Sequence, residues 1–319
     1  MAVEQFARAG GGAVRAEPGP QGVQEHLTLL VFQVRDAAQG PGRQPLGQPR
    51  AGDDQRLGQP IVELAAYRSW DIGAAKLTDP PDVDAVVHCA ASATDTGVAR
   101  EVWRTNLLGT HHVLATFPDC RFVHVSSASV YDPYRPTVRA KEQEAPVEKY
   151  LNAYAAAKAA AEQLVLAIAR DAVVLRPHAV YGAGDTTLLP RLLENLRGTR
   201  LLVPGTGRVL VSMTEVDGLA RACLLAATTE PGWPSVFNIA DSAPVPIDWA
   251  LRGLLASAGV PVRPVYVPAR VLAPLARVFP GGRLNRYVIS QFAMERTLDI
   301  TAAIDRLGYR PAPTSFPAR

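Results

Sequence analysis

The chain is poor in cysteine and in methionine, with three of each among 319 residues. Cys89, Cys120 and Cys223 lie far apart and show no paired spacing. The sequence therefore predicts neither a disulfide framework nor a zinc site, and we expect no metal. Such sparse, unpaired cysteines are typical of a reducing compartment, so we expect a cytoplasmic protein.

Long apolar runs and an excess of one charge are also missing. No window approaches about 18 uninterrupted apolar residues, and the first residues lack a charged start followed by an apolar stretch, so we expect neither a membrane span nor a signal peptide. Thirty-three basic and 30 acidic residues leave a net charge of only +3. This balance argues against a nucleic-acid or membrane-surface protein. The 48% of hydrophobic residues can build a full core.

The N-terminal segment, residues 1–65, has an unusual composition. Residues 39–60 hold five Gly, four Pro and five Gln and almost nothing apolar, which predicts a loop or a disordered segment. Before this tract, the apolar residues 27–34 are consistent with a strand. We expect an atypical, partly disordered N-terminal segment.

Strands and helices alternate after that segment. Apolar runs predict strands at residues 84–88, 121–126 and 172–176, and helical patterns occupy residues 97–117 and 152–170. Apolar strands of this kind predict an α/β protein with a doubly wound parallel sheet covered on both faces.

The expected organisation has two parts after residue 65. A dinucleotide-binding core covers residues 66–185, with strands returning near 209–240. Shorter helices and Pro-rich loops in residues 186–208 and 241–319 predict a smaller substrate-binding part.

The sharpest chemical signal is Tyr154-Ala-Ala-Ala-Lys158. Residues four apart on a helix share a face, so the phenol and the ammonium are expected side by side. A cation about 4 Å from a phenol favours the phenolate by roughly 4 kcal/mol at an effective dielectric near 20, which could lower the tyrosine pKa by up to about three units. The alternative is an accidental pair on an amphipathic helix. With nine Tyr and only four Lys in the chain, such a pair is rare by chance.

Serines follow the predicted strand 121–126, in Val125-Ser-Ser-Ala-Ser-Val-Tyr131. In open parallel sheets ligands bind where strands end. A serine there, then Tyr-x-x-x-Lys, then Leu175-Arg-Pro177 and Tyr181-Gly-Ala-Gly-Asp185, resembles the extended short-chain dehydrogenase/reductase superfamily. The resemblance covers about residues 70–311 and implies a Rossmann-like fold and NAD or NADP as cofactor.

The same resemblance implies roles for three residues. Ser127 would hydrogen-bond the substrate oxygen, Tyr154 would donate or accept the proton, and Lys158 would lower the tyrosine pKa and hold the nicotinamide ribose. Ser126 and Ser129 are the alternatives to Ser127.

Other positions resemble cofactor contacts of the superfamily. Asp71 and Ile72 look like the pair that meets the adenine. Ala90 and Ala91 end a strand expected to lie under the cofactor, where small side chains let the backbone approach. His88, just before them, is expected to satisfy a local hydrogen bond.

Three further residues extend the implied site. Asn106 matches a helix asparagine that supports the active-site geometry, the alternative being a solvated helix residue. Pro177 and His178, after the strand 172–176, would lie near the nicotinamide side of the pocket.

A strand followed by a Gly-x-x-Gly-x-x-Gly turn and a helix is missing, although the superfamily should open with one to hold the pyrophosphate. Gly10-Gly-Gly12 follows no buried strand and leads into no helix. A shifted reading frame or misplaced start over residues 1–65 and a diverged member both fit, and the abrupt change of composition favours the first. Arg35 and Asp36 offer one candidate each for NADP and NAD, so the cofactor stays NAD or NADP.

A second missing feature, an arginine after a Gly-x-Gly turn, indicates the substrate class. Relatives acting on nucleotide sugars usually place an arginine a few residues after a Gly-x-Gly turn, whereas here Val211 takes that position and Arg208 is out of register. A buried diphosphate without a charge partner would be costly. Several apolar residues instead resemble those of the 3β-hydroxysteroid dehydrogenase-like branch, although each of them could be a core residue. They are Leu188, Leu189, Leu192, Val271, Leu272 and Leu275.

We therefore expect an NAD(P)-dependent oxidoreductase that transfers hydride to or from a hydroxyl or keto group of a mostly apolar small molecule. The alternatives are a nucleotide-sugar epimerase or dehydratase and a non-catalytic NAD(P)-sensing relative. We expect a small-molecule substrate, no nucleic-acid or membrane partner, and leave a homodimer open.

Overall fold

The computed structural model describes residues 14–15, 26–27, 29–31, 70–93, 98–185, 187–228, 235–278 and 285–317. The Gly10–Gly12 cluster, Arg35, Asp36 and the tract 39–60 lie outside these residues. The expectations for a phosphate turn, for cofactor choice and for a loop there therefore stay predictions.

A five-stranded parallel sheet forms the centre of the described structure, in the order β13-β7-β5-β4-β3. Its strands are β3 (Leu29–Val31), β4 (Ala85–His88), β5 (Arg121–Val125), β7 (Ala172–Pro177) and β13 (Ser235–Ile239). Every residue of β4, β5 and β7 is buried, as expected of a sheet covered on both faces. The predicted parallel sheet is confirmed.

Within the strand expected at residues 27–34, the described residues Leu29–Val31 form β3. β3 pairs in parallel with β4, with Leu29 opposite Ala85 and Val31 opposite Val87. In the doubly wound strand order 3-2-1-4-5-6, the first strand lies beside the fourth. β3 therefore takes the place of the opening strand, while His26–Leu27 form a separate strand, β2, that pairs with β1 (Val14–Arg15).

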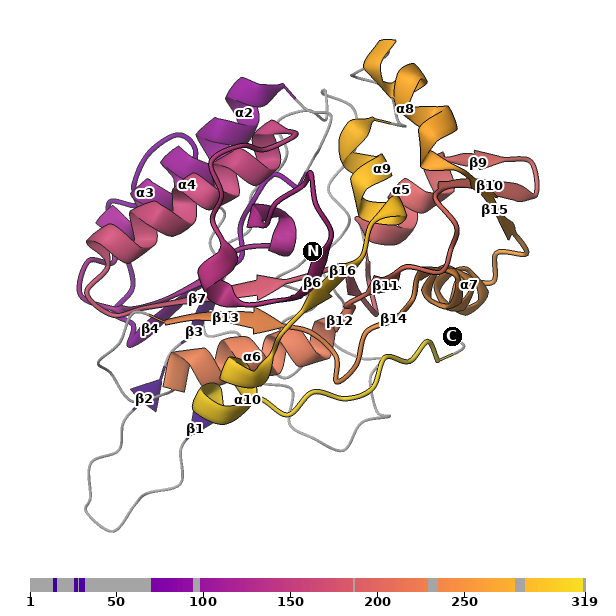
Figure 1. Ribbon diagram of the computed structural model, residues 1–319. Helices are drawn as coiled ribbons and strands as arrows, with labels where there is room; N and C mark the ends of the chain where they lie inside the picture. Colours follow the sequence, from indigo (N-terminus) through magenta and orange to yellow (C-terminus); the bar gives the residue numbers. More distant parts are fainter. Residues whose placement is uncertain are drawn as a thin grey trace, which may run out of the picture.

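Helices cover both faces of this sheet (Figure 1). On one face lie α2 (Ala99–Trp103), the π-helical segment η1 (Arg104–Leu108), α3 (Gly109–Thr116) and α4 (Ala153–Ile168). The other face carries α6 (Val216–Thr228) and α10 (Thr301–Leu307). The predicted helices 97–117 and 152–170 are confirmed, except that a π-helical turn interrupts the first.

Further elements stand beside the carboxyl ends of the strands, on the right of Figure 1. They are β9 (Leu196–Arg197), β10 (Arg200–Pro204), β15 (Arg263–Val267), α5 (Leu188–Glu194), α7 (Ile247–Ser257), α8 (Ala269–Val278) and α9 (Arg286–Ala293). β6 (Thr137–Ala140) pairs with β16 (Arg296–Leu298), so a small sheet runs across the boundary expected between the two parts. The expected boundaries themselves stay predictions.

The apolar residues of α5 belong to a core. Leu192 is buried, and Leu188 and Leu189 pack against the same cluster, which also contains Val211. These leucines therefore support the fold of this region, and they give no indication of the substrate. Val271 on α8 is 60% exposed.

No helix in the described ranges is both long and apolar enough to cross a membrane.

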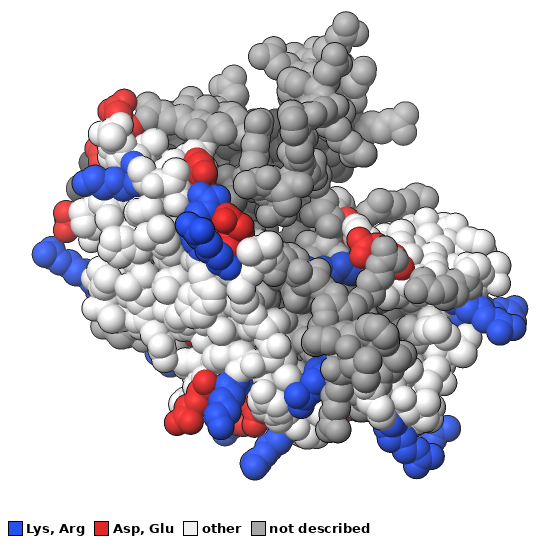
Figure 2. All heavy atoms as spheres, turned by 90° about the horizontal axis from the view of Figure 1, so that it is seen from above, with Lys and Arg blue, Asp and Glu red and all other residues white. Residues whose placement is uncertain are grey.

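Figure 2 shows acidic and basic side chains interspersed over the described surface of one face, without separation by sign.

Candidate active site

The three serines after β5 have different partners. Ser126 Oγ donates a hydrogen bond to the Glu162 carboxylate. Ser127 begins the short 3₁₀ helix η2 (Ala128–Val130), where its Oγ accepts from the Ser129 N–H at 3.1 Å. The Ser127 side chain also lies beside Tyr154 and lowers the pKa of its phenol, whereas the Ser129 hydroxyl is buried without a hydrogen-bond partner. Of the three serines, Ser127 is the one that contacts the tyrosine.

The start of α4 places Tyr154 beside this turn. Asn152 caps the helix, because its Oδ1 accepts from the Ala155 N–H at 2.9 Å. Tyr154 is thus in the first turn and half-buried, and Lys158 follows one turn later with only 3% of its surface exposed. The helix brings both side chains toward the carboxyl end of β5, as the spacing predicts.

The pKa of Tyr154 moves in the opposite direction to the expected one. Burial raises it, and this effect outweighs the hydrogen bond with Ser127 and the positive charge of Arg191, which both lower it. The expected fall of the tyrosine pKa under the influence of Lys158 is therefore wrong for the protein alone.

The orientation of Lys158 gives the physical reason. Its Nζ donates to the Val125 carbonyl oxygen at 2.8 Å, so the ammonium is bound to the end of β5. Burial lowers the pKa of Lys158 to about 8, although the nearby Cys89 and Glu162 oppose the fall. An ammonium has three N–H donors, so this lysine can hold a strand carbonyl and hydroxyl groups of a ligand together.

Asn106 fixes the loop after β4. Its Oδ1 accepts from the Ser92 N–H at 2.7 Å and its Nδ2 donates to the Ser92 carbonyl at 3.1 Å. Asn106 is 1% exposed and lies in the π-helical segment η1, so the alternative of a solvated helix residue is wrong. π-Helical turns are frequent at functional sites. Ala90 is buried and Ala91 half-buried in this fixed loop, which suits a close approach of the backbone to a dinucleotide.

Asp71 and Ile72 lie beside the face of the sheet that α3 and α4 cover. The Asp71 carboxylate accepts from the Gly73 N–H at 2.9 Å and lies 3.3 Å from the Arg104 guanidinium. Ile72 is fully buried against Gly109, where an added Cβ would come within 2.7 Å of the isoleucine side chain. Their expected contact with an adenine stays a prediction.

Two histidines of the sequence analysis are held by neighbours. His88 Nε2 lies 2.9 Å from Thr110 Oγ1, the local hydrogen bond expected of it, and burial lowers its pKa to about 3. His178 Nδ1 lies 2.8 Å from the Ser212 carbonyl. Pro177, the residue before His178, ends β7.

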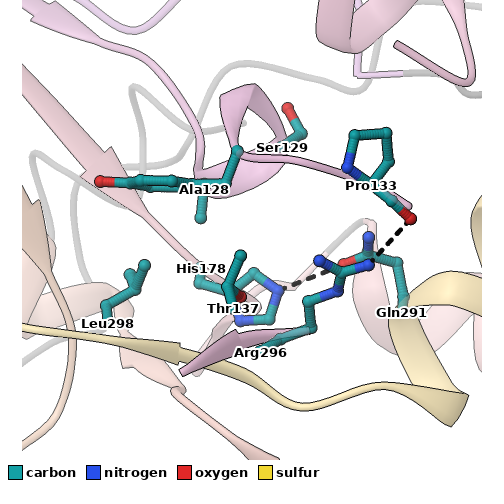
Figure 3. Close-up of a pocket in the computed structure, with 9 residues that line it drawn as sticks. Ala128, Ser129, Pro133, Thr137, His178, Gln291, Arg296 and Leu298 are labelled. Carbon is teal, nitrogen blue, oxygen red and sulfur yellow. Dashed lines mark hydrogen bonds between the residues drawn. The ribbon is translucent and has the colours of Figure 1, made fainter. Parts of the chain in front are cut away.

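His178 also lines a small cavity of about 10 Å³, which has room for about one water molecule. Figure 3 shows His178 directed toward Gln291, at 3.3 Å, beside the Arg296 guanidinium, which donates to the Pro133 carbonyl. Arg296 is 6% exposed and binds the backbone carbonyls of residues 132, 133 and 135. This cavity is too small for an organic substrate.

Two features of the site were missed in the sequence. Glu162 and Arg176 form an ion pair of 2.7 Å at 0% and 1% exposure. Their signals were present, since Glu162 follows Lys158 by four residues and Arg176 is the centre of Leu175-Arg-Pro177. No spacing pointed to Arg191, which reaches the site from α5.

Comparisons with known proteins agree with this geometry. Residues 65–240 match the model of the NAD dependent epimerase/dehydratase family. The chain is 34% identical over 246 residues to a 4-hydroxy-2-methyl-3-oxo-4-farnesyl-3,4-dihydroquinoline-1-oxide ketoreductase of Stigmatella aurantiaca, covering 71% of this chain and 72% of that protein. It is 32% identical to a 2-alkyl-3-oxoalkanoate reductase of Stenotrophomonas maltophilia, covering 72% and 76% respectively.

Solved structures agree as well. The structure of MoeE5 in complex with UDP-glucuronic acid and NAD matches with a TM-score of 0.56 and 26% identity, covering 73% of this chain and 75% of that one. The expected superfamily, the Rossmann-like α/β fold, an NAD(P)-dependent oxidoreductase activity and NAD or NADP as cofactor are confirmed. The chain belongs to the NAD dependent epimerase/dehydratase family.

Proposed function

We propose that the protein reduces a keto group, or oxidises a hydroxyl group, of a mostly apolar small molecule, with Ser127, Tyr154 and Lys158 as its catalytic residues. The observation that supports this proposal is the position of Tyr154 beside the Ser127 side chain at the end of β5, with Lys158 one turn further along α4.

The residues around this triad fit a dinucleotide. The Ala90–Ala91 backbone would lie under it, Lys158 would hold ribose hydroxyls, and Asp71 with Ile72 would meet the adenine. Asn106 would act through the loop after β4, and Pro177 with His178 would border the nicotinamide. When bound, the cofactor supplies or accepts the hydride at the substrate carbon.

The chain's own residues would handle the substrate oxygen. Ser127 donates a hydrogen bond to the carbonyl oxygen and orients it, and Tyr154 gives its proton to that oxygen as the carbon receives hydride. In the reverse direction the hydroxyl proton passes to the phenolate of Tyr154. Because burial raises the pKa of Tyr154, the phenol is protonated at neutral pH and is ready to act as the acid of the reduction.

The charge of Lys158 would act on the phenolate that the reduction leaves. Lys158 lies one turn from Tyr154 and its pKa is lowered to about 8, so it is mostly protonated at pH 7. Arg191 adds a second positive charge that favours the phenolate. The two cations oppose the cost of forming an anion in a buried place.

The names of the relatives support the substrate class. One is named a ketoreductase of a farnesylated quinoline oxide and another a reductase of 2-alkyl-3-oxoalkanoates, which are keto acids with alkyl chains. The alternative of a nucleotide-sugar epimerase or dehydratase is favoured by the likeness to MoeE5 with UDP-glucuronic acid. Against it, the position where a diphosphate-binding arginine would fall is Val211, which is buried in a core. A homodimer and a cytoplasmic location stay predictions.

Cofactor titration and turnover test the proposal together. NADH and NADPH are titrated into the purified protein by fluorescence, and we expect at least one to bind below millimolar concentration. The protein is then given NAD(P)H with a panel of alkyl ketones and keto acids, and separately UDP- and dTDP-sugars. Net oxidation of NAD(P)H with a ketone supports the proposal, whereas redox-neutral conversion of a nucleotide sugar alone contradicts it. If neither nucleotide binds at millimolar concentration, the oxidoreductase proposal fails for this chain.

A further inference from the structure

The turn that begins at Ser127 is closed by its own hydrogen bonds. Ser127 Oγ accepts from the Ser129 N–H at 3.1 Å, and the Ser127 carbonyl accepts from the Val130 N–H at 3.3 Å. Tyr131, which follows η2, is 3% exposed, and its hydroxyl donates to Asn238 Oδ1 at 2.7 Å. The inner side of the turn is therefore tied to β13 of the parallel sheet.

The chain that leaves this turn is held by Arg296, a residue of β16. The Arg296 guanidinium donates to the carbonyl oxygens of residues 132, 133 and 135 at 2.8, 3.2 and 3.0 Å. Its Nε donates to the Ser290 carbonyl of α9 at 3.2 Å. One buried side chain thus joins the loop after Tyr131 to a helix that lies beside the parallel sheet.

Two other contacts connect the same loop to the C-terminal residues. The Thr137 N–H donates to the Glu295 carbonyl at 2.9 Å, next to the pairing of β6 with β16. The Arg286 guanidinium lies 6.0 Å from the centre of the Tyr134 ring, but both side chains are exposed. Exposed cation–π contacts contribute less than buried hydrogen bonds from a charged donor. Arg296 is therefore the main side-chain link between the loop and the C-terminal residues.

A small cavity separates the turn from Arg296. It has a volume of about 10 Å³, with Ala128 and Ser129 on one side and Gln291 and Arg296 on the other (Figure 3). Protein interiors are close-packed, and structure collapses into a void only as far as its surroundings allow. Truncation of Arg296 would enlarge this void and release three backbone carbonyls, so the turn would gain room to move.

We propose that Arg296 is a positioning residue of the active site, which sets the place of the Ser127 hydroxyl by holding the loop after Tyr131. This inference rests on the proposed function and adds to it a residue distant in sequence from the triad. Because η2 is closed by its own hydrogen bonds, a displacement of the loop moves the turn as one piece. A displacement of about 1 Å in a group that orients the substrate can cost about 100-fold in rate.

Single variants measure the size of the effect. The probes are 2-decanone and methyl 3-oxodecanoate, reduced with whichever of NADH and NADPH binds. In Arg296→Met, kcat should fall about 10- to 100-fold, while the Kd of NAD(P)H, followed by fluorescence, should change less than about threefold. Arg296→Lys should retain part of the activity, because it keeps a charged donor but loses the planar fork. Arg263→Met is the matched control, since Arg263 is an exposed arginine of β15 and should leave both quantities unchanged.

A double-variant cycle tests whether Arg296 acts through Ser127. Ser127→Ala removes the hydroxyl whose place Arg296 sets, so in this background Arg296→Met should lower kcat less than about threefold. An arginine that only stabilises the fold would lower kcat by the same factor with and without the Ser127 hydroxyl, and that result overturns the proposal. If Arg296→Met does not fold, Arg296→Lys carries the same comparison, and its smaller loss should also disappear in Ser127→Ala.

Hydrogen exchange separates this proposal from the proposed function, because it needs no substrate. In Arg296→Met, the amides of residues 129–131 should exchange at least about tenfold faster than in the wild type, whereas those of α4 should not change. Unchanged exchange in the turn would show that Arg296 does not hold it, and would overturn the proposal. If the wild type turns over neither probe nor any ketone of the wider panel, the proposed function fails, while the exchange still shows whether Arg296 holds the turn.

Discussion

Two stretches of α4 use the same spacing for different purposes. Tyr154, Lys158 and Glu162 follow one another at four-residue intervals and share one face of the helix. Near the start of the helix, Tyr154 is half-buried and contacts Ser127. Two turns later, Glu162 is fully buried, and its oxygens are bound by Ser126 and by the Arg176 guanidinium at 2.7, 3.0 and 3.2 Å.

The difference lies in where the hydrogen-bonding capacity of each side chain is used. The Glu162 oxygens accept their hydrogen bonds from residues inside the protein, so this side chain stabilises the junction of α4, β5 and β7 and is not available to bind a ligand. Tyr154 lies beside Ser127 at the carboxyl end of β5, where the proposed function places the substrate oxygen. The same face of one helix is thus structural at one end and, in the proposed function, chemical at the other.

The largest expected effect comes from breaking the chemical end. Tyr154→Phe removes the proposed proton donor, and we expect kcat for ketone reduction to fall about 10³- to 10⁴-fold, the upper range for general acid catalysis. The thermal midpoint should stay within a few degrees, because only one hydroxyl is lost. Steady-state rates of NAD(P)H oxidation and a thermal melt measure the two quantities.

Tyr150→Phe is the control for this variant. Tyr150 lies four residues earlier, and its hydroxyl binds the backbone of Val147 and Val130 at 2.9 and 3.3 Å. Removing that hydroxyl should leave kcat nearly unchanged. A Tyr154→Phe variant with a rate near that of the wild type would show that the proton passes through another group.

The next effect comes from breaking the structural end. Glu162→Gln leaves the buried Arg176 without its opposite charge, and we expect the free energy of unfolding to fall by about 3 to 5 kcal/mol. Denaturant unfolding measures this loss. The matched control is Asp119→Asn, because Asp119 and Arg170 form an exposed pair, at 75% and 84% side-chain exposure, and should lose at most about 1 kcal/mol.

A double variant sharpens the interpretation. Glu162→Leu with Arg176→Met replaces the pair by apolar side chains and should recover most of the lost stability if the cost comes from one uncompensated charge. Equal losses for Glu162→Gln and Asp119→Asn would mean that burial does not distinguish the two pairs.

Much of the fold could be predicted from local pattern. Apolar runs at 84–88, 121–126 and 172–176 and the capped helix that starts at Asn152 are decided by residues close together in the chain, so periodicity finds them. Tyr154 and Lys158 could be paired for the same reason. The π-helical segment around Asn106 could not be predicted in this way, because it depends on the hydrogen bonds between this side chain and the loop after β4.

The parts that were missed depend on contacts distant in sequence. The pKa of Tyr154 depends on burial and on Arg191, 37 residues away, and Lys158 is directed by a strand carbonyl 33 residues before it. Spacing along one helix contains neither fact. The leucines of α5 show the same limit, since a helical apolar pattern does not tell a core from a ligand pocket.

The smallest expected effect concerns His124. Unlike the buried Glu162 carboxylate, which is hydrogen-bonded, the His124 ring has both nitrogens buried without a hydrogen-bond partner. Burial and the charge of Lys158 lower the pKa of His124 well below 6.5. Below pH 6.5 this imidazole therefore binds a proton in the unfolded chain but not in the folded protein. The free energy of unfolding then decreases as the pH decreases, by up to about 1.4 kcal/mol per pH unit. Above pH 6.5 this loss is absent. In His124→Leu, the loss of unfolding free energy between pH 6.5 and 5 should be about 2 kcal/mol smaller than in the wild type, whereas His111→Gln, at an exposed histidine, should not change it. Parallel stability curves for His124→Leu and the wild type would mean that His124 is hydrated and able to titrate in the folded protein, which would remove the contrast with the fully bonded Glu162.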